Sequence, residues 1–303
     1  METIWGVDLG GTKLEGVVLA NDEANTVLKR LRIPTEADKG YDHILRQIRL
    51  LITQLTRETG QAPSAIGFGT PGVLDPQTQT MKNCNTVSLN GQPLQDDLTR
   101  VLGVPVVLAN DANCFALAET KLGSVAEAKP GAEVVFGVIM GTGVGGGVVV
   151  NGRLLNGHHG IAGEWGHNFL DVSGGPCYCG RVGCVETILS GKGLERYYTQ
   201  LSGKALDLKE IHERHRKHID PYATATMQRL AHFFGQAISV VINILDPDVI
   251  VLGGGVGNVD LLYTDGVAMA EAKVFNNRLD TLFLKPKLGD SAGVFGAAML
   301  VAG

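Results

Sequence analysis

Short apolar stretches and longer amphipathic segments alternate along this chain, and the pattern predicts its secondary structure. Apolar residues at spacings of three and four predict helices over 41–58 and 223–245, and further helices begin at Asp111 and after Gly293. Each short, mostly apolar run predicts a buried strand. The predicted strands are residues 4–9, 14–20, 65–69, 104–109, 134–140, 148–150 and 249–252. Strands that alternate with helices indicate an α/β fold with mainly parallel sheets.

One arrangement of strands and turns occurs twice. VDLGGTKLEGVVLAND near the start and VIMGTGVGGGVVVNGR in the middle share the same order, which is a buried strand, a glycine turn, a second buried strand and a polar turn. Two such units suggest two similar domains that face each other across a cleft. Any two β-hairpins would share this order, so the repetition alone does not decide the matter.

Composition narrows the range of functions. The chain has 303 residues, of which 44% are apolar, and a net charge of −5 with basic residues scattered along it. No basic stripe favours nucleic acid, and no apolar run is long enough to span a membrane. The first residues, METIWGVDLGG, lack the pattern of a signal peptide, so we expect a cytoplasmic protein. Five cysteines, an odd number, argue against a closed disulfide framework.

Two glycine-rich turns follow buried strands and are candidates for phosphate binding. In DLGGTK (8–13) and MGTGVGGG (140–147), successive N–H groups can converge on one anion, and Thr12 and Thr142 add hydroxyl donors. Asp8 ends its strand, where a carboxylate could hold Mg²⁺. The alternative is that both are tight hairpin turns without a ligand.

Two better-known phosphate motifs do not fit this chain. The glycines from Gly141 onward match G-x-G-x-x-G, but that fingerprint must open a helix, and Val148–Val150 predicts a strand instead. No Walker-type G-x-x-x-x-G-K-[ST] motif occurs anywhere in the sequence. We therefore expect phosphate to be held by hairpin turns.

A candidate acid–base residue lies in VLANDANCFALAE. Asn110 and Asp111 stand where a predicted strand ends and a helix begins, and ligands of open α/β sheets bind at such strand ends. An aspartate there can accept the proton of a hydroxyl that attacks the γ-phosphoryl group. Asp and Asn are also ordinary helix N-caps, so this segment alone favours capping.

A cluster of metal-ligand residues lies in GHNFLDVSGGPCYCGRVGCVE. His167, Cys177, Cys179 and Cys184 suit a tetrahedral, structural Zn²⁺ site without an open position. A disulfide is less suited to a reducing compartment. Glu164 and Glu186 flank this loop, and carboxylates can accept hydrogen bonds from sugar hydroxyls. Each of them could equally be a solvated surface charge.

Together these motifs resemble the ROK family (repressors, open reading frames and sugar kinases) of the actin-like ATPase superfamily. The resemblance covers essentially the whole chain. The matching segments are DLGGTK (8–13), GTPG (69–72), NDAN (110–113), GTGVGGG (141–147), GEWGH (163–167), CYCGRVGCVE (177–186) and LGGG (252–255).

The resemblance implies a fold of two actin-like (ribonuclease H-like) α/β domains that face each other across a cleft, as in hexokinases. The smaller N-terminal domain would comprise residues 1–113 plus 290–303. The larger C-terminal domain, with the zinc-binding loop, would comprise 114–289. The family also implies a homodimer. Its repressor branch carries a winged helix-turn-helix before the first phosphate loop, for which the sequence before Asp8 leaves no room.

The resemblance also implies roles for individual residues. Asp111 would be the general base, and His167 would bind both zinc and sugar. The implied sugar contacts are Asn85, Asn110, Asp111, Glu164, His167 and Glu186. The implied contacts to ATP and its Mg²⁺ are Asp8, Gly10, Gly11, Thr12, Lys13, Gly141, Thr142, Gly143, Gly254, Gly255 and Asn258.

Within the family, three segments are most similar to bacterial fructokinases and mannokinases. These are KNCNTVSLNGQPL, AGEWGHN and NILDPDVIVLGGG. The resemblance therefore implies an ATP-dependent kinase for the 6-hydroxyl of fructose, mannose or glucose. The alternatives are an N-acetylhexosamine kinase, such as an N-acetylglucosamine kinase, and a sugar-responsive regulator without turnover.

Overall fold

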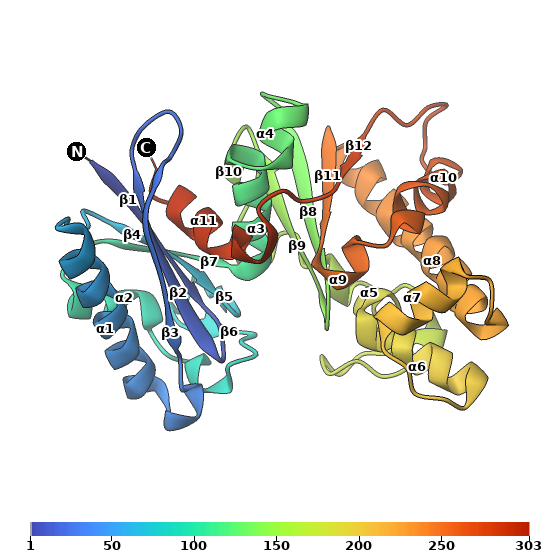
Figure 1. The fold of residues 1–303 in the computed structure, drawn as a ribbon, viewed down its shortest axis with the longest axis horizontal. Helices are drawn as coiled ribbons and strands as arrows, with labels where there is room; N and C mark the ends of the chain where they lie inside the picture. Colours follow the sequence, from blue (N-terminus) through green and yellow to red (C-terminus); the bar gives the residue numbers. More distant parts are fainter. Residues whose placement is uncertain (1, 303) are drawn as a thin grey trace. The chain divides into compact units, whose positions relative to one another are not determined.

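The computed structural model describes residues 2–302 as a mixed α/β protein with two compact units (Figure 1). Unit 1 holds the chain up to Gly123, then Arg153–Ala162, then the chain from Leu288. Unit 2 holds Ser124–Gly152 and Gly163–Lys287. The actin-like domain limits expected after residue 113 and before residue 290 stay a prediction.

Unit 1 is built on a five-stranded sheet. Its strands are β1 (Thr3–Leu9), β2 (Lys13–Ala20), β3 (Val27–Pro34), β4 (Ile66–Thr70) and β7 (Val106–Asn110). Their order is β3-β2-β1-β4-β7, in which β1, β4 and β7 are parallel and β2 and β3 are antiparallel. A small hairpin, β5 (Val73–Leu74) with β6 (Met81–Lys82), follows β4.

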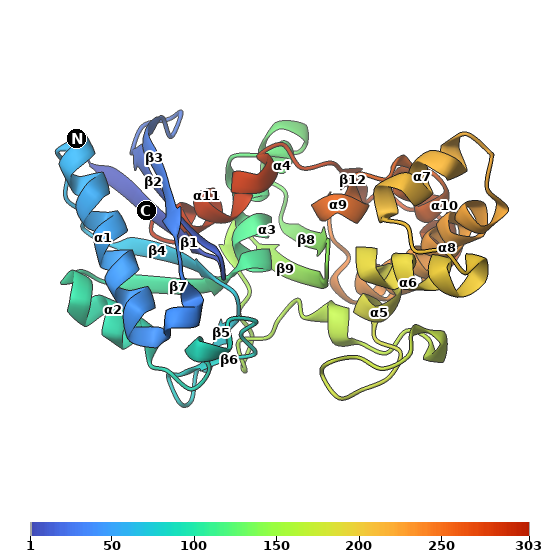
Figure 2. The same cartoon turned by 60° about the horizontal axis from the view of Figure 1, so that its bottom comes forward.

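Helices cover both faces of this sheet (Figures 1 and 2). The helices of unit 1 are α1 (Tyr41–Thr59), α2 (Leu94–Leu102), α3 (Asp111–Lys121) and α11 (Ala292–Met299). Strand residues alternate between faces, so Trp5, Val7 and Leu9 pack in the core with α1 and α2. On the other face, α11 packs on β1 and β4.

Glycine makes the approach of α11 possible. A Cβ on Gly67 would lie 1.8 Å from the carbonyl oxygen of Ala297, and one on Gly296 would lie 1.8 Å from that of Cys114. Such contacts exclude any side chain, since real Cβ atoms do not come within 3.0 Å of other heavy atoms. The C-terminal helix is thereby fixed against both β4 and α3.

Unit 2 contains the second sheet. Its strands are β8 (Val134–Met140), β9 (Val144–Val150), β11 (Val249–Gly253) and β12 (Leu282–Leu284); the short β10 (Arg153–Leu154) falls within the residues of unit 1. Within unit 2 the order is β9-β8-β11-β12, in which β8 and β9 are antiparallel and β8, β11 and β12 are parallel. The repeated hairpin predicted from sequence is thus present in both sheets, beside a parallel third strand.

The helices of unit 2 are α4 (Ser124–Ala128), α5 (Val185–Leu189), α6 (Gly191–Ser202), α7 (Leu208–Arg216), α8 (Pro221–Leu245), α9 (Gly254–Gly257) and α10 (Asp265–Glu271). Most of them pack on the long helix α8, and two short ones, α4 and α9, lie against β11. Leu230, Phe234 and Ile238 of α8 join Phe136 and Val138 of β8 in one buried core. Within residues 2–302, no helix has the length and apolar character needed to cross a bilayer.

One predicted boundary is wrong by several residues. The sequence places Gly145–Gly147 in a turn, but β9 already begins at Val144. A Cβ on Gly146 would lie 2.7 Å from the carbonyl oxygen of Gly163 and 2.8 Å from Cδ1 of Trp165. Gly146 therefore allows the segment with Gly163 and Trp165 to pack closely against β9. A glycine-rich turn and a glycine-rich strand look alike in sequence, so the start of β9 could not be predicted.

Candidate active site

In unit 1, the candidate residues lie at the carboxyl ends of three parallel strands. The register pairs Asp8 with Gly69 in β4, and Gly69 with Ala109 in β7. One step further, Thr70 pairs with Asn110, so β1, β4 and β7 end at the same edge. This is the edge at which ligands of open α/β sheets bind.

Asp8 fits a cation site. Its carboxylate lies against two glycines, since a Cβ on Gly69 or Gly293 would come within 3.2–3.4 Å of its oxygens. No residue among 2–302 donates a hydrogen bond to this carboxylate or forms an ion pair with it. A partly buried carboxylate without a protein partner is a suitable oxygen ligand for Mg²⁺, directly or through water.

The electrostatic environment of Asp8 agrees with that interpretation. Burial raises the pKa of Asp8 to about 6, and the negative charges of Asp111 and Glu15 act in the same direction, whereas Lys13 and Arg32 oppose them. Glu15 stands directly opposite Asp8 in the β1–β2 pair. Like charges around a buried carboxylate favour the binding of a cation there.

The turn after β1 has a fixed backbone. The N–H of Gly10 donates to the carbonyl oxygen of Lys13 at 3.1 Å, which closes the turn. Thr35, the residue after β3, holds the turn, since its hydroxyl donates to the carbonyl oxygen of Gly10 at 2.6 Å and its N–H to that of Thr12 at 3.0 Å. Gly11, Thr12 and Lys13 are exposed. The turn thus presents its backbone to solvent in a fixed conformation, as a phosphate cradle requires.

The loop with Asn85 lies beside this turn. The hydroxyl oxygen of Thr86 would be 3.3 Å from a Cβ on Gly11. Asn90 fixes the loop, because its side chain accepts the N–H of Cys84 at 2.9 Å and donates to the carbonyl oxygen of Cys84 at 3.2 Å. The exposed Asn85 is held through its own N–H, which donates to the carbonyl oxygen of Pro71.

The structure separates the roles of Asn110 and Asp111. Asn110 is the N-cap of α3, since its side-chain oxygen accepts the N–H of Asn113 at 2.7 Å. Asp111 is the first helical residue and accepts the N–H of Ala112 at 2.7 Å. Its side chain keeps access to solvent, yet partial removal from water raises the pKa of Asp111. The position of Asn110 is therefore explained by its role as the helix cap. Asp111 does not cap the helix, so its position at the strand end points to another function.

In unit 2, the two other glycine loops lie side by side. The N–H of Gly141 donates to the carbonyl oxygen of Gly143 at 2.9 Å and closes the β8–β9 turn. Gly254 has φ of 78°, and a Cβ on it would lie 2.3 Å from the carbonyl oxygen of Met140. Thr142, Gly255 and Asn258 are exposed at these two loops. Unit 2 therefore brings together one part of the predicted nucleotide contacts, whereas those from Asp8 to Lys13 belong to unit 1.

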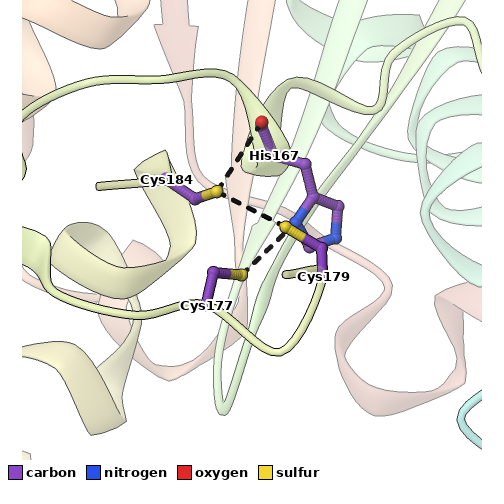
Figure 3. A group of neighbouring side chains, drawn as sticks. All are labelled: His167, Cys177, Cys179 and Cys184. Carbon is purple, nitrogen blue, oxygen red and sulfur yellow. Dashed lines mark hydrogen bonds between the residues drawn. The ribbon is translucent and has the colours of Figure 1, made fainter. Parts of the chain in front are cut away.

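The four predicted metal ligands converge (Figure 3). One ligand atom from each of His167, Cys177, Cys179 and Cys184 lies within 4.8 Å of the other three. Cys177 Sγ is 3.7 Å from His167 Nδ1, and Cys179 Sγ is 3.7 Å from Cys184 Sγ. Ligands at tetrahedral positions around Zn²⁺ stand about 3.5–3.8 Å apart, given Zn–S of about 2.3 Å and Zn–N of about 2.0 Å. The residues present thus fit zinc through Nδ1 of His167, and all five cysteines of the chain are free thiols.

The two glutamates beside this cluster, Glu164 and Glu186, both lie close to strand β9. Glu186, on α5, accepts the N–H of Val144 at 3.0 Å, and its Oε2 lies so near Gly143 that a Cβ there would be 2.5 Å away. The metal loop is thereby linked to the glycine turn of β8–β9. Glu164 is the N-cap residue of a single 3-10 turn over Trp165–His167. That turn packs tightly on β9, where a Cβ on Gly166 would lie 2.1 Å from the carbonyl oxygen of Val144.

Sequence reasoning missed several residues that shape these sites. Thr35 and Thr86 position the first glycine turn although they lie far from it in sequence. Gly293 lies against the carboxylate of Asp8 from the C-terminal end of the chain. Tyr178 contacts His167 from within the metal loop. The polar sequence around Thr86 and the position of Tyr178 between two metal ligands were the only local signals.

Comparisons with known proteins place these features in one family. Residues 4–303 match the ROK family. The N-acetyl-D-glucosamine kinase of Yersinia pseudotuberculosis is 34% identical, with 98% of both chains covered. The crystal structure of a ROK hexokinase from Thermus thermophilus is 33% identical with a TM-score of 0.86, over 98% of this chain and 97% of that one. A ROK family glucokinase from Streptomyces griseus, solved in complex with glucose and AMPPNP, is 28% identical with a TM-score of 0.77, over 98% of both chains.

Proposed function

The chain belongs to the ROK family and is a sugar kinase, and from this premise we propose that it transfers the γ-phosphoryl group of ATP to the 6-hydroxyl of a hexose. The observation that carries the proposal is the position of Asp111, which directly follows the end of β7, raises the pKa of Asp8 through its charge and is not needed as a helix cap. The same edge of the sheet holds Asp8, whose carboxylate fits Mg²⁺.

In the proposed reaction, Asp111 accepts the proton of the attacking hydroxyl. Its raised pKa makes the carboxylate a stronger base than an aspartate in water. The N–H groups of Gly11 and Thr12 in the first turn, and of Thr142 in the second, donate to phosphate oxygens, while those of Gly10 and Gly141 close the turns. Mg²⁺ held by Asp8 would neutralise charge on the phosphates of ATP. Gly254, Gly255 and Asn258 contact the adenosine side.

The proposed sugar contacts are hydrogen-bonding groups with fixed positions. Asn110 is held by its capping bond and Glu186 by the N–H of Val144. Asn85, Glu164 and His167 complete the set, each as expected from the family resemblance. The metal loop, with a structural Zn²⁺, would hold His167 and the neighbouring carboxylates in place and takes no part in the chemical step.

For the sugar, we propose an unmodified hexose such as fructose, mannose or glucose. The similarity of KNCNTVSLNGQPL, AGEWGHN and NILDPDVIVLGGG to fructokinases and mannokinases supports it, as does the likeness to a hexokinase. A second candidate is N-acetyl-D-glucosamine, which the name of the 34% identical relative supports. A cytoplasmic location and a homodimer stay predictions.

A sugar panel tests this proposal. ADP release with Mg-ATP is measured by a coupled assay against fructose, mannose, glucose, N-acetylglucosamine and N-acetylmannosamine. We expect a plain hexose to give the highest kcat/KM, at least tenfold above both acetylated sugars. The reverse order would keep the mechanism and replace the substrate by the second candidate. No sugar-dependent ADP release from a folded, zinc-loaded sample would contradict the proposed function.

A further inference from the structure

A row of charged side chains crosses the three strands that lead to the first glycine turn. The register places Glu15 of β2 directly opposite Asp8 of β1, and Arg32 of β3 directly opposite Glu15. Residues that are directly opposite in an antiparallel pair have their side chains on the same face of the sheet, with Cβ atoms about 5 Å apart. The row therefore lies on one face, which is the face that α11 covers.

Glu15 contributes a buried negative charge with a fixed position. Only 1% of its side chain is exposed. Its Oε1 lies 3.1 Å from Nε of Arg30, and its Oε2 lies 2.8 Å from Nη2 of Arg32. Arg30 is held in turn, because it donates to the hydroxyl of Ser291 at 2.9 Å, just before α11. The two arginines thus hold Glu15 from β3, and Asp8 lies on its other side in β1.

Stability alone does not explain a charged residue at this position. Like charges that stand directly opposite each other in a sheet destabilise it, and Asp8 and Glu15 are such a pair. A buried ion pair loses in desolvation much of what it gains by attraction. Moreover, Oε1 of Glu15 accepts no hydrogen bond from any of residues 2–302. An uncharged side chain could fill the same space, so the charge itself points to a function.

A cation at Asp8 would turn this repulsion into attraction. It would lie near two carboxylates, one of them without a hydrogen bond or ion pair from residues 2–302 and the other fixed by arginines. Glu15 is closed off from solvent and therefore cannot be a ligand itself. Its charge acts across a short distance through buried surroundings, where salt screens it little.

We propose that Glu15 is a positioning residue of the Mg²⁺ site, whose buried charge strengthens the binding of Mg²⁺ at Asp8 without touching the ion. This inference rests on the proposed function, in which Asp8 holds the Mg²⁺ of the nucleotide. Glu15 takes no part in proton transfer and contacts neither the sugar nor the phosphates. Its effect is therefore confined to binding steps that involve the cation.

The Glu15→Gln variant tests the inference, because it removes the charge and nearly keeps the shape. ADP is titrated by calorimetry into the wild type and the variant, once in EDTA and once with excess Mg²⁺. We expect the ratio of the Kd of Mg-ADP to the Kd of metal-free ADP to rise roughly tenfold. Coulomb's law gives this factor for a unit charge about 6 Å from a divalent cation, even at the dielectric constant of water. A purely structural defect would weaken both forms of ADP equally and leave the ratio unchanged.

Two variants control for structural effects. Glu58→Gln is the matched control, because Glu58 also pairs with a cation of β3, Lys29, but lies on α1. Ser291→Ala removes the hydroxyl to which Arg30 donates and changes no charge. We expect both variants to keep the wild-type ratio within twofold, and we expect all variants to keep the wild-type Kd of the sugar.

Arg32→Gln gives a test of the opposite sign, which also applies if Glu15→Gln does not fold. The side chain of Arg32 is 42% exposed, and Glu15 keeps its pair with Arg30. Removal of this positive charge, about two strand spacings from Asp8, should lower the ratio roughly 2- to 4-fold.

The outcomes separate this inference from the proposed function. A ratio that changes less than twofold in Glu15→Gln, or that rises in Arg32→Gln, would overturn the inference while the kinase activity stands. A rise in Ser291→Ala equal to that in Glu15→Gln would also overturn it, in favour of a role in placing α11 against Asp8. A wild type whose ADP binding does not depend on Mg²⁺ would overturn it together with the assignment of Asp8. Failure of the proposed function itself would appear separately, as the absence of phosphoryl transfer to any sugar by the wild type.

Discussion

Replacement of Asp111 by Asn tests the assignment of the general base with little disturbance of the fold. The amide is nearly isosteric, and its oxygen can still accept the N–H of Ala112, which the carboxylate accepts at 2.7 Å. The cap of α3 is unaffected because Asn110 supplies it. The substitution therefore removes the ability to accept a proton and leaves the local structure intact.

The expected loss of kcat is that of a general base alone, because Asn110 and not Asp111 caps α3. General-base catalysis contributes typically 10²–10⁴-fold to a rate. Because partial burial raises the pKa of Asp111, its carboxylate is a better base than one in water, and we expect a loss toward the upper end of that range. A 10³–10⁴-fold lower kcat corresponds to about 4–5.5 kcal/mol of transition-state stabilisation.

The assay is steady-state ADP release with saturating Mg-ATP and the preferred sugar, combined with the thermal midpoint and the Kd of the sugar. Asp265→Asn is the matched control, because Asp265 is likewise the first residue of a helix, α10, and lies outside the predicted sites. We expect Asp111→Asn to lose kcat with a thermal midpoint within about 2 °C of the wild type. A kcat within tenfold of the wild type would refute the assignment of Asp111 as the base.

Three further predictions concern the metal loop and the two units. Cys179→Ser should abolish stoichiometric zinc, measured by atomic emission, whereas Cys84→Ser, at a thiol outside the cluster, should retain it. Gly296→Ala should destabilise the protein by at least about 1–3 kcal/mol in urea unfolding, because its Cβ would meet a carbonyl oxygen at 1.8 Å. Asp220→Ala should cost about 1–2 kcal/mol at pH 7, since Asp220 caps α8 and accepts the hydroxyl of Tyr198 at 2.7 Å. Burial alone would raise the pKa of Asp220, but these hydrogen bonds lower it overall, so the wild-type advantage should be present above pH 3.8 and disappear as the pH falls below it. Stability curves of this variant that parallel the wild type down to pH 3 would contradict the reasoning.

Local patterns were enough to predict much of the fold. The strand over 134–140 has the predicted bounds, and the helices over 41–59 and 221–245 differ from the prediction by one or two residues. These segments carry their signal in their own spacing of apolar residues. The edge strand β3 was not predicted, because its exposed and half-buried residues alternate without a continuous apolar run.

Contacts between distant segments could not be predicted in the same way. Nothing near Asp8 in sequence indicates that Gly293 lies against its carboxylate. Likewise, Thr35 braces Gly10 only because β3 pairs with β2. The convergence of the predicted metal ligands could be expected, because Cys177, Cys179 and Cys184 lie close together in sequence and cysteine is a typical zinc ligand. The direction of Tyr178 toward His167 depends on the path of the loop, which only coordinates reveal.

The most direct test of the central claim is the identity of the product. The protein is incubated with Mg-ATP and its preferred sugar, and the product is examined by ³¹P and ¹³C NMR while ADP is quantified. The account predicts a phosphate ester on C6, formed in equal amount to ADP, and absent with Asp111→Asn under the same conditions. An ester on another carbon, or ADP accompanied only by inorganic phosphate, would contradict it.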